Sequence, residues 1–305
     1  MIPRIILFID LKLTLENPKM RKLIFFISTL IVLIFSFSAC KDKNTEVNYQ
    51  HQLNGVHNIN LLQHSINEFT TTYIKAINDS TLINKPETII VIEGCYLRLN
   101  TSGTIVKLFM DYGTGSFVHD RWLQGVINVE ITGGVNTLGS TAVFNFETFT
   151  CDYTPKNIIT SEICTITVEN KTSSSITYIQ EFTNFKSTTD TVDNNWAAMS
   201  GQNSYDYIKS GDSEYYAVDD TISISTTCNY IDYAGRILSC ASTTPSQLQK
   251  DCSYLTYGKS QIDISSPVVS SGTLICNETP KICMSRFRFE MDSDLFEFEQ
   301  QWLVK

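Results

Sequence analysis

The amino-acid sequence predicts a mainly β protein, built of antiparallel sheets of many short strands with one amphipathic helix near the N-terminus. Thr, Ser, Ile, Tyr and Phe are abundant, and such residues favour strands over helices. After Pro86, short β-branched and aromatic segments alternate with turn signals. The gaps between them are too short for the crossovers that parallel strands need, so the pairing is expected to be antiparallel.

The N-terminal segment predicts export. Residues 20–22 form a short basic head, and residues 23–37 form an unbroken run of apolar and small residues, which is the pattern of a signal peptide. A membrane-spanning helix is the weaker interpretation, because it needs roughly 20 apolar residues. We therefore expect a signal peptide over residues 20–39. Residues 1–19 contain acidic side chains that do not fit a basic head, so we interpret them as a gene-model extension.

The four residues Phe37-Ser38-Ala39-Cys40 resemble the lipobox of bacterial lipoproteins. That resemblance implies cleavage before Cys40 and attachment of lipid to this cysteine, whose several acyl chains give an effectively permanent membrane anchor. The alternative is an ordinary secretory signal with an incidental cysteine. Residues 40–52 are then the anchor and a polar tether. The expected location is the cell envelope, as an outer-membrane lipoprotein that could be displayed at the surface.

The charge of the exported part argues against one class of partner. Of the 23 basic and 32 acidic residues, five and two respectively precede Cys40, so 18 and 30 remain and the formal charge is −12. An acidic surface repels phosphate backbones, so we expect no nucleic-acid partner. The expected partners are the membrane, through lipid on Cys40, and an extracellular glycan or protein.

The helix is predicted from the spacing of apolar residues. Six of them recur every three or four positions and so share one helical face: Ile59, Leu62, Ile66, Phe69, Tyr73 and Ile77. His64 falls off this face and is expected to be solvated. The domain organisation that we expect is the helix with an N-terminal β half over residues 53–186, a connecting segment over residues 187–212, and a C-terminal β half over residues 213–305.

Cysteine content predicts a disulfide framework. Eight cysteines follow Cys40, and an even number in an exported chain is typical of disulfides, although eight cysteines permit 105 pairings: Cys95, Cys151, Cys164, Cys228, Cys240, Cys252, Cys276 and Cys283. The close pairs Cys151/Cys164 and Cys276/Cys283 are candidates to staple one hairpin each. No Cys-x-x-Cys pair occurs, so disulfides or buried thiols are favoured over zinc.

The densest polar cluster surrounds a glycine-rich turn and contains Asp111, His119, Asp120 and Arg121. These side chains could converge on a ligand. The simpler interpretation is that they stabilise the turn: Asp111 caps it, and Arg121 pairs with Asp111 across the hairpin. We identify no catalytic residues, metal ligands or cofactor-binding motif, because no nucleophile elbow, zinc helix or phosphate loop occurs.

The same region resembles uncharacterised secreted lipoproteins of Bacteroidota. The resemblance rests on the Asp-(aromatic)-Gly-x-Gly turn of residues 111–115, the following Asp120-Arg121, and the Thr-rich hairpin up to residue 149. It continues at Thr244-Pro245 and Cys252. This chain lacks the glycine that the family has between Asp120 and Arg121. The resemblance implies an extracytoplasmic β fold behind a lipid anchor and implies no chemistry.

Three tripeptides resemble acceptor sites for O-linked glycans in exported proteins of that group. Their hydroxyl residues are Ser80, Thr191 and Thr221, each preceded by Asp.

Other features have simple structural interpretations. The acidic pairs Asp219/Asp220 and Glu297/Glu299 are expected to be solvated edge residues.

The three tryptophans, Trp122, Trp196 and Trp302, are expected to be core more often than a carbohydrate platform. On these grounds a lipid-anchored binding or structural module of the outer membrane or cell surface is favoured over an enzyme. The alternative is an extracytoplasmic hydrolase acting on glycans or peptides.

Overall fold

The computed structural model describes residues 43–101, 105–118, 121–151, 157–189, 195–210, 220–248, 257–277, 286–291 and 294–299. The chain divides into two compact units, Met1–His51 and Gln52–Lys305. The sheet, most of the long helix and the candidate site belong to the second unit. In the described part of the chain, no helix combines the length and apolar character needed to cross a membrane.

The described elements are two helices and eighteen strands. They are α2 (Lys43–Ile77), α3 (Ser80–Asn84), β1 (Ile89–Ile92), β2 (Cys95–Asn100), β3 (Val106–Asp111), β4 (Ser116–Val118), β5 (Arg121–Gln124), β6 (Val126–Thr132), β7 (Thr141–Phe146), β8 (Thr150–Cys151), β9 (Asn157–Thr160), β10 (Ile163–Lys171), β11 (Ser175–Thr189), β12 (Trp196–Ile208), β13 (Thr221–Asp232), β14 (Ile237–Leu248), β15 (Tyr257–Ser266), β16 (Ser270–Asn277), β17 (Arg286–Met291) and β18 (Asp294–Glu299).

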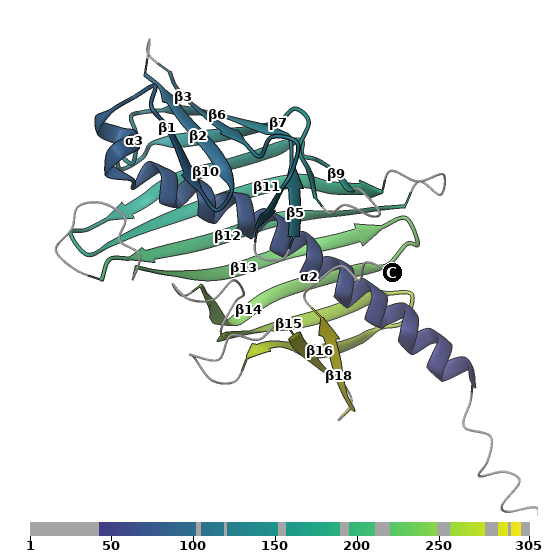
Figure 1. The fold of residues 1–305 in the computed structure, drawn as a ribbon. Helices are drawn as coiled ribbons and strands as arrows, with labels where there is room; N and C mark the ends of the chain where they lie inside the picture. The colour runs from purple at the N-terminus through teal and green to yellow at the C-terminus, as the bar shows by residue number, and fades with distance from the viewer. Residues whose placement is uncertain are drawn as a thin grey trace, which may run out of the picture. The chain divides into compact units, whose positions relative to one another are not determined.

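The strands form a largely sequential antiparallel sheet, as the sequence predicts (Figure 1). From β10 to β18, every strand pairs with the next one along the chain. The N-terminal strands continue the sheet in the order β1, β2, β3, β6, β7 and then β10. A side branch of β4, β5, β8 and β9 joins at β11 through β9.

Helix α2 is enclosed on all sides over part of its length. All ten residues from Ser65 to Ile74 are buried, and ten consecutive residues point in every direction around a helix of 3.6 residues per turn. The six apolar residues that predict the helix are at most 3% exposed. Figure 1 shows α2 lying obliquely across the strands.

The helix differs from its prediction in the treatment of its polar side. His64 is 7% exposed rather than solvated, and Asn60, Asn67 and Glu68 are buried with it. The apolar stripe therefore accounts for one side of the helix only. The other sides are covered by sheet residues that offer hydrogen-bonding groups. For example, the Tyr205 hydroxyl of β12 lies 2.8 Å from Asn67 Oδ1.

The expected connecting segment, residues 187–212, is wrong as a stretch without secondary structure. It contains the last residues of β11 and all of β12, a strand of 13 residues that pairs with both β11 and β13. The five strands from β11 to β15 have 10 to 15 residues each, longer than the short strands expected. The two β halves are thus parts of one sheet.

No disulfide joins any two of the six cysteines that the structure describes: Cys95, Cys151, Cys164, Cys228, Cys240 and Cys276. The expected staple between Cys151 and Cys164 is wrong, because Cys151 lies on β8, which pairs with β5 and β9, whereas Cys164 lies on β10, which pairs with β7 and β11. Cys252 and Cys283 lie outside the described residues, and so does the expected Cys276/Cys283 pair.

Candidate functional site

The turn cluster predicted from the sequence is described only in part. Asp111 ends β3, and its Oδ1 accepts a hydrogen bond of 2.7 Å from the Gly113 backbone N–H, so Asp111 caps its own turn as predicted. Gly115 closes the turn at φ +134°, where an added Cβ would lie 1.9 Å from the Trp122 ring. The Trp122 ring therefore packs directly against the backbone of this turn.

The other members of that cluster carry no site in the described structure. His119 and Asp120 lie outside the described residues. Arg121 begins β5, but its side chain lies outside the description, so its predicted pairing with Asp111 remains a prediction. Cys40 and Thr191 also lie outside the described residues.

Two of the three candidate glycan acceptors follow an aspartate with a structural role. Asp79 is the N-cap of α3, and its carboxylate accepts bonds of 2.9 Å from the backbone N–H groups of Thr81 and Leu82. Asp220 precedes Thr221 and is 7% exposed, so its expected place on a solvated edge is wrong. Its carboxylate accepts hydrogen bonds from the Tyr207 hydroxyl and from Ser210. Modification at Ser80 and Thr221 remains a prediction.

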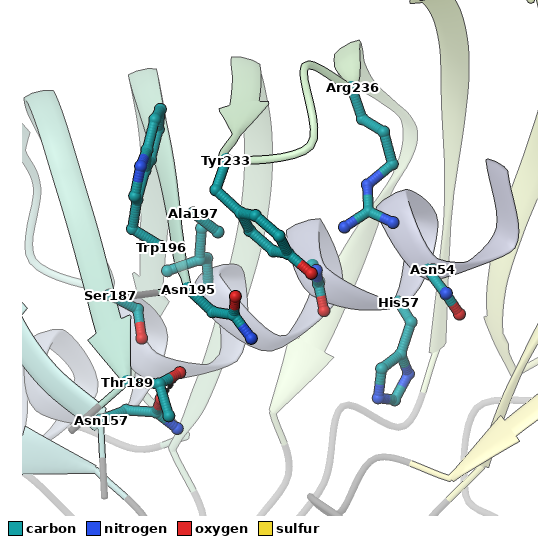
Figure 2. A pocket seen from close by; sticks show the side chains of 12 residues that line it. Asn54, His57, Asn157, Ser187, Thr189, Asn195, Trp196, Ala197, Tyr233 and Arg236 are labelled. Atoms are coloured by element: carbon teal, nitrogen blue, oxygen red, sulfur yellow. Dashed lines mark hydrogen bonds between the residues drawn. The ribbon is translucent and has the colours of Figure 1, made fainter. Parts of the chain in front are cut away.

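A pocket of about 360 Å³ opens elsewhere, where α2 meets the ends of β9, β11 and β12 and the β13–β14 turn (Figure 2). The helix contributes Asn54, His57, Asn58 and Leu62. Asn54 is exposed, His57 and Asn58 are half-buried, and Leu62 is buried. The helix thus offers two amides, an imidazole and one apolar side chain.

The second wall of the pocket comes from β9 and β11 and carries only hydroxyls and an amide. Asn157, Ser187 and Thr189 supply it. Thr189 Oγ1 donates a hydrogen bond of 3.2 Å to Asn157 Oδ1, and Asn157 is 2% exposed. The antiparallel pairing of β9 with β11 sets this arrangement, since Asn157 lies directly opposite Thr189.

The start of β12 supplies the edge of this wall. Asn195, Trp196 and Ala197 all line the pocket, although the Trp196 ring is directed to the other face of the strand. Trp196 lies opposite Thr188, and neighbouring residues of a strand point to opposite faces, so the ring is on the face away from Ser187 and Thr189. There Lys186 Nζ sits 4.9 Å from the ring centroid. The tryptophans that suggest a carbohydrate platform therefore do not form one among the described residues.

The third wall is the tight turn between β13 and β14, which carries Tyr233 and Arg236 (Figure 2). Asp232 organises it: one carboxylate oxygen accepts from the backbone N–H groups of Ala234 and Arg236, and the other lies 2.6 Å from Arg236 Nε and 2.7 Å from the Tyr230 hydroxyl. The Asp232 and Arg236 side chains are 0% and 5% exposed. Figure 2 shows the Arg236 guanidinium directed toward α2.

This turn presents one aromatic ring to the opening. Tyr233 is 52% exposed, and its backbone N–H donates 3.0 Å to the carbonyl of Trp196, so the turn is tied to the start of β12. The Arg236 guanidinium carbon lies 6.0 Å from the Tyr233 ring centroid. Tyr233 is therefore the aromatic group that a ligand in the pocket would meet.

The pocket is close to electrically neutral. Arg236 is its one charged lining residue among those described, and the Asp232 carboxylate offsets that charge. Burial lowers the pKa of His57 from its usual 6.5, so the imidazole is neutral at pH 7. It stacks on Phe287 of β17 at 6.3 Å. The lining thus offers neutral hydrogen-bond donors and acceptors rather than a net charge that would select ions.

The lining lacks the groups of common hydrolases. Of the described residues around the pocket, none is Asp, Glu or Cys. A glycosidase needs two carboxylates across the bond that it cleaves, and a hydrolase of the Ser-His-Asp type needs a carboxylate that orients its histidine. In the described part of the chain, no group of three or more His, Cys, Asp or Glu residues could hold a metal ion.

A second cavity lies further along α2 but is too small for a ligand. Its volume is about 10 Å³, which is enough for about one water molecule. Asn60, Gln63 and His64 line it from the helix, with Ser246 and Cys276 from the sheet. Burial raises the pKa of the Cys276 thiol to about 11, so this thiol stays protonated and inert at neutral pH.

Sequence reasoning missed the larger pocket, although a weak signal for it exists. Its polar residues come from five segments that are far apart in the chain, and no local motif joins them. The signal is the turn Asp232-Tyr-Ala-Gly-Arg236, in which an aspartate cap and a glycine flank an aromatic residue.

Comparisons with known proteins add no homologue. No protein-family model matches the chain, no curated protein matches it, and no solved structure matches it. The protein can therefore be classified only by its structure. It has an antiparallel sheet that encloses a helix, with a neutral pocket lined by amides and hydroxyls. The resemblance to Bacteroidota lipoproteins remains a prediction.

Proposed function

We propose that the chain is a binding protein of the bacterial cell envelope, held to the membrane by lipid on Cys40, which takes a neutral saccharide in the pocket beside Tyr233. The observation that carries this proposal is the lining itself. Side-chain amides and hydroxyls surround one half-exposed aromatic ring, and the one lining charge is compensated. Sugars offer many neutral hydroxyl donors and acceptors together with an apolar face that packs on aromatic rings.

The pocket lining also favours binding over catalysis. Four asparagines contribute to it: Asn54, Asn58, Asn157 and Asn195. An amide both donates and accepts, which matches a sugar hydroxyl, but it neither activates water nor protonates a leaving group at neutral pH. The absence of lining carboxylates among the described residues agrees with a role in which the ligand is held and not cleaved.

Binding is tested by titrating the purified chain with neutral oligosaccharides of glucose, galactose, mannose and N-acetylglucosamine, followed by calorimetry or saturation-transfer NMR. Tyr233→Ala should weaken binding about tenfold or more, because it removes the half-exposed ring at the opening of the pocket. Tyr96→Ala is the matched control, since Tyr96 is 53% exposed and lies outside the pocket. Equal affinities of the two variants, or no binding by any saccharide in the millimolar range, would overturn the proposal.

The lipid anchor is tested separately by labelling cells with an alkyne fatty acid. Cys40→Ala should lose the label, because Cys40 is the proposed attachment site, whereas Cys164→Ala should keep it as a cysteine control. Protease treatment of intact cells then reports whether the chain is at the surface. Label that persists in the Cys40→Ala variant would refute attachment at Cys40.

A further inference from the structure

Two cysteines lie opposite each other on the neighbouring strands β13 and β14. Cys228 of β13 pairs directly with Cys240 of β14. Directly opposed residues of antiparallel strands have Cα atoms about 4.5 or 5.5 Å apart, and disulfides form across Cα distances of about 4.4–6.8 Å. The backbone therefore already holds the two residues at a separation that a disulfide spans.

The two side chains also point to the same place. Gln63 of α2 donates through Nε2 to both sulfurs, at 3.3 Å from Cys228 Sγ and 3.5 Å from Cys240 Sγ. The neighbouring Cys240 thiol, together with burial, raises the pKa of Cys228. Both residues are 2% exposed. The two sulfurs thus lie together against helix α2.

We propose that Cys228 and Cys240 form a disulfide bond when the folding chain meets a disulfide donor. The thiolate of one of the two cysteines attacks one sulfur of the donor disulfide and releases one donor thiol, which leaves a mixed disulfide. The thiolate of the other cysteine then attacks the protein sulfur of this mixed disulfide and releases the second donor thiol. The two protein thiols are oxidised to one disulfide, and the donor disulfide is reduced to two thiols. The donor is an oxidised dithiol protein of an export compartment or, in solution, oxidised glutathione.

The other described cysteines lack this arrangement. Cys164 accepts a long hydrogen bond of 3.6 Å from Gln180 on the neighbouring strand, and burial raises its pKa to about 12. Cys95 lies on β2 and is paired with Ile92 of β1. Among the described cysteines, a directly opposed pair therefore exists only between β13 and β14.

The position of the bond gives it a consequence for the site. Cys228 and Cys240 close the hairpin whose turn contains Asp232, Tyr233 and Arg236. Three residue pairs separate Cys228 and Cys240 from the turn, so a disulfide between them would restrict opening of this end of the hairpin and hold the Tyr233 wall of the pocket in place. This consequence rests on the proposed function, whereas the bond itself does not.

The bond is tested without any ligand. The chain is unfolded in urea and refolded with mixed oxidised and reduced glutathione, then denatured, alkylated and digested for mass spectrometry. We expect peptides containing Cys228 and Cys240 to appear joined, with both sulfurs protected from alkylation. Cys164→Ser should keep the joined peptide, and Cys228→Ser should lose it.

Hydrogen exchange provides a second measurement that does not depend on the variants folding. Exchange in residues 229–239 of the wild type should slow after oxidation and recover after reduction with dithiothreitol. Full alkylation of Cys228 and Cys240 after oxidative refolding, or a joined peptide that pairs either of them with another cysteine, would overturn the proposal.

Discussion

Helix α2 meets the sheet in two different ways along its length. Near its C-terminal end Phe69 lies among four aromatic rings at centroid distances of 5.2–6.1 Å: Phe144, Phe146, Phe149 and Phe185. From Asn54 to Asn67, by contrast, the helix presents amides and histidines to polar sheet residues and to the pocket. Both regions contain buried residues, so burial alone does not distinguish the part that holds the fold from the part that offers a site.

The aromatic and the amide-rich parts of helix α2 have different physical roles. Aromatic burial contributes free energy of folding and needs no partner with matching polar groups. Buried amides are costly unless every group is hydrogen-bonded, so their placement demands a specific arrangement. A chain that keeps several amides beside a cavity retains donors and acceptors that a ligand can use.

The largest effect is expected at the aromatic end. Phe69→Ala should lower the free energy of unfolding by about 3–5 kcal/mol, because Phe69 is 0% exposed and its removal leaves a cavity among four rings. Urea denaturation measures this loss. Leu138→Ala is the control, since Leu138 is 62% exposed, and it should change stability by less than about 0.5 kcal/mol. A similar small change for both variants would show that the aromatic cluster does not anchor the helix.

A smaller effect is expected where the two regions meet. The buried Tyr205 hydroxyl lies 2.8 Å from Asn67 Oδ1 and 2.9 Å from Gln180 Oε1, and it accepts a bond of 3.0 Å from Asn203. Tyr205→Phe should cost about 1–3 kcal/mol, because it leaves buried amide groups without this partner. Tyr96→Phe, at an exposed tyrosine, should leave the urea midpoint unchanged. Equal stability of Tyr205→Phe and Tyr96→Phe would contradict a stabilising role of the buried Tyr205 hydroxyl.

The smallest effect is a dependence on pH at the polar end. Burial holds the pKa of His57 below 6.5, so the unfolded chain binds a proton that the folded chain does not when the pH falls below 6.5. The free energy of unfolding therefore decreases with falling pH, until the folded pKa is passed. His57→Gln should make this acid slope shallower in urea titrations between about pH 7 and 5, whereas Asn54→Gln should keep the wild-type slope. Identical slopes would contradict the role of His57.

The sequence predicts the secondary structure best where one face of an element is apolar. The stripe from Ile59 to Ile77 identifies the helix, and the alternation in Val126–Thr132 identifies β6, because each side-chain period reflects one buried face. Strand β12 escapes prediction since its inward side chains include Asn203 and Tyr205, which are buried through hydrogen bonds and not through hydrophobicity. The sequence does not predict β14 either, because the residues near Pro245 are small and polar. The register of the strand also shifts there.

The site is harder to predict than the fold for a related reason. The local cap at Asp111 follows from residue types within one turn and is present as predicted. The pocket requires Asn54 of α2 to come near Asn195 and Tyr233, and this depends on the course of the whole sheet. Nothing in the spacing of these residues reveals it, because each one alone is typical of a solvated loop or helix surface.

The contacts of helix α2 also determine the order in which the chain can mature. The strands from β10 onward are joined to their sequence neighbours, so each hairpin can form as soon as it is made. The contacts of the helix with the sheet form later, because Gln63 contacts Cys240 across 177 residues and Gln52 contacts Val268 across 216 residues of the chain. Closing such long loops is entropically costly and slow. Although α2 precedes every described strand in the chain, it is therefore among the last of the described elements to be covered, and its apolar stripe stays exposed until the C-terminal strands have been made.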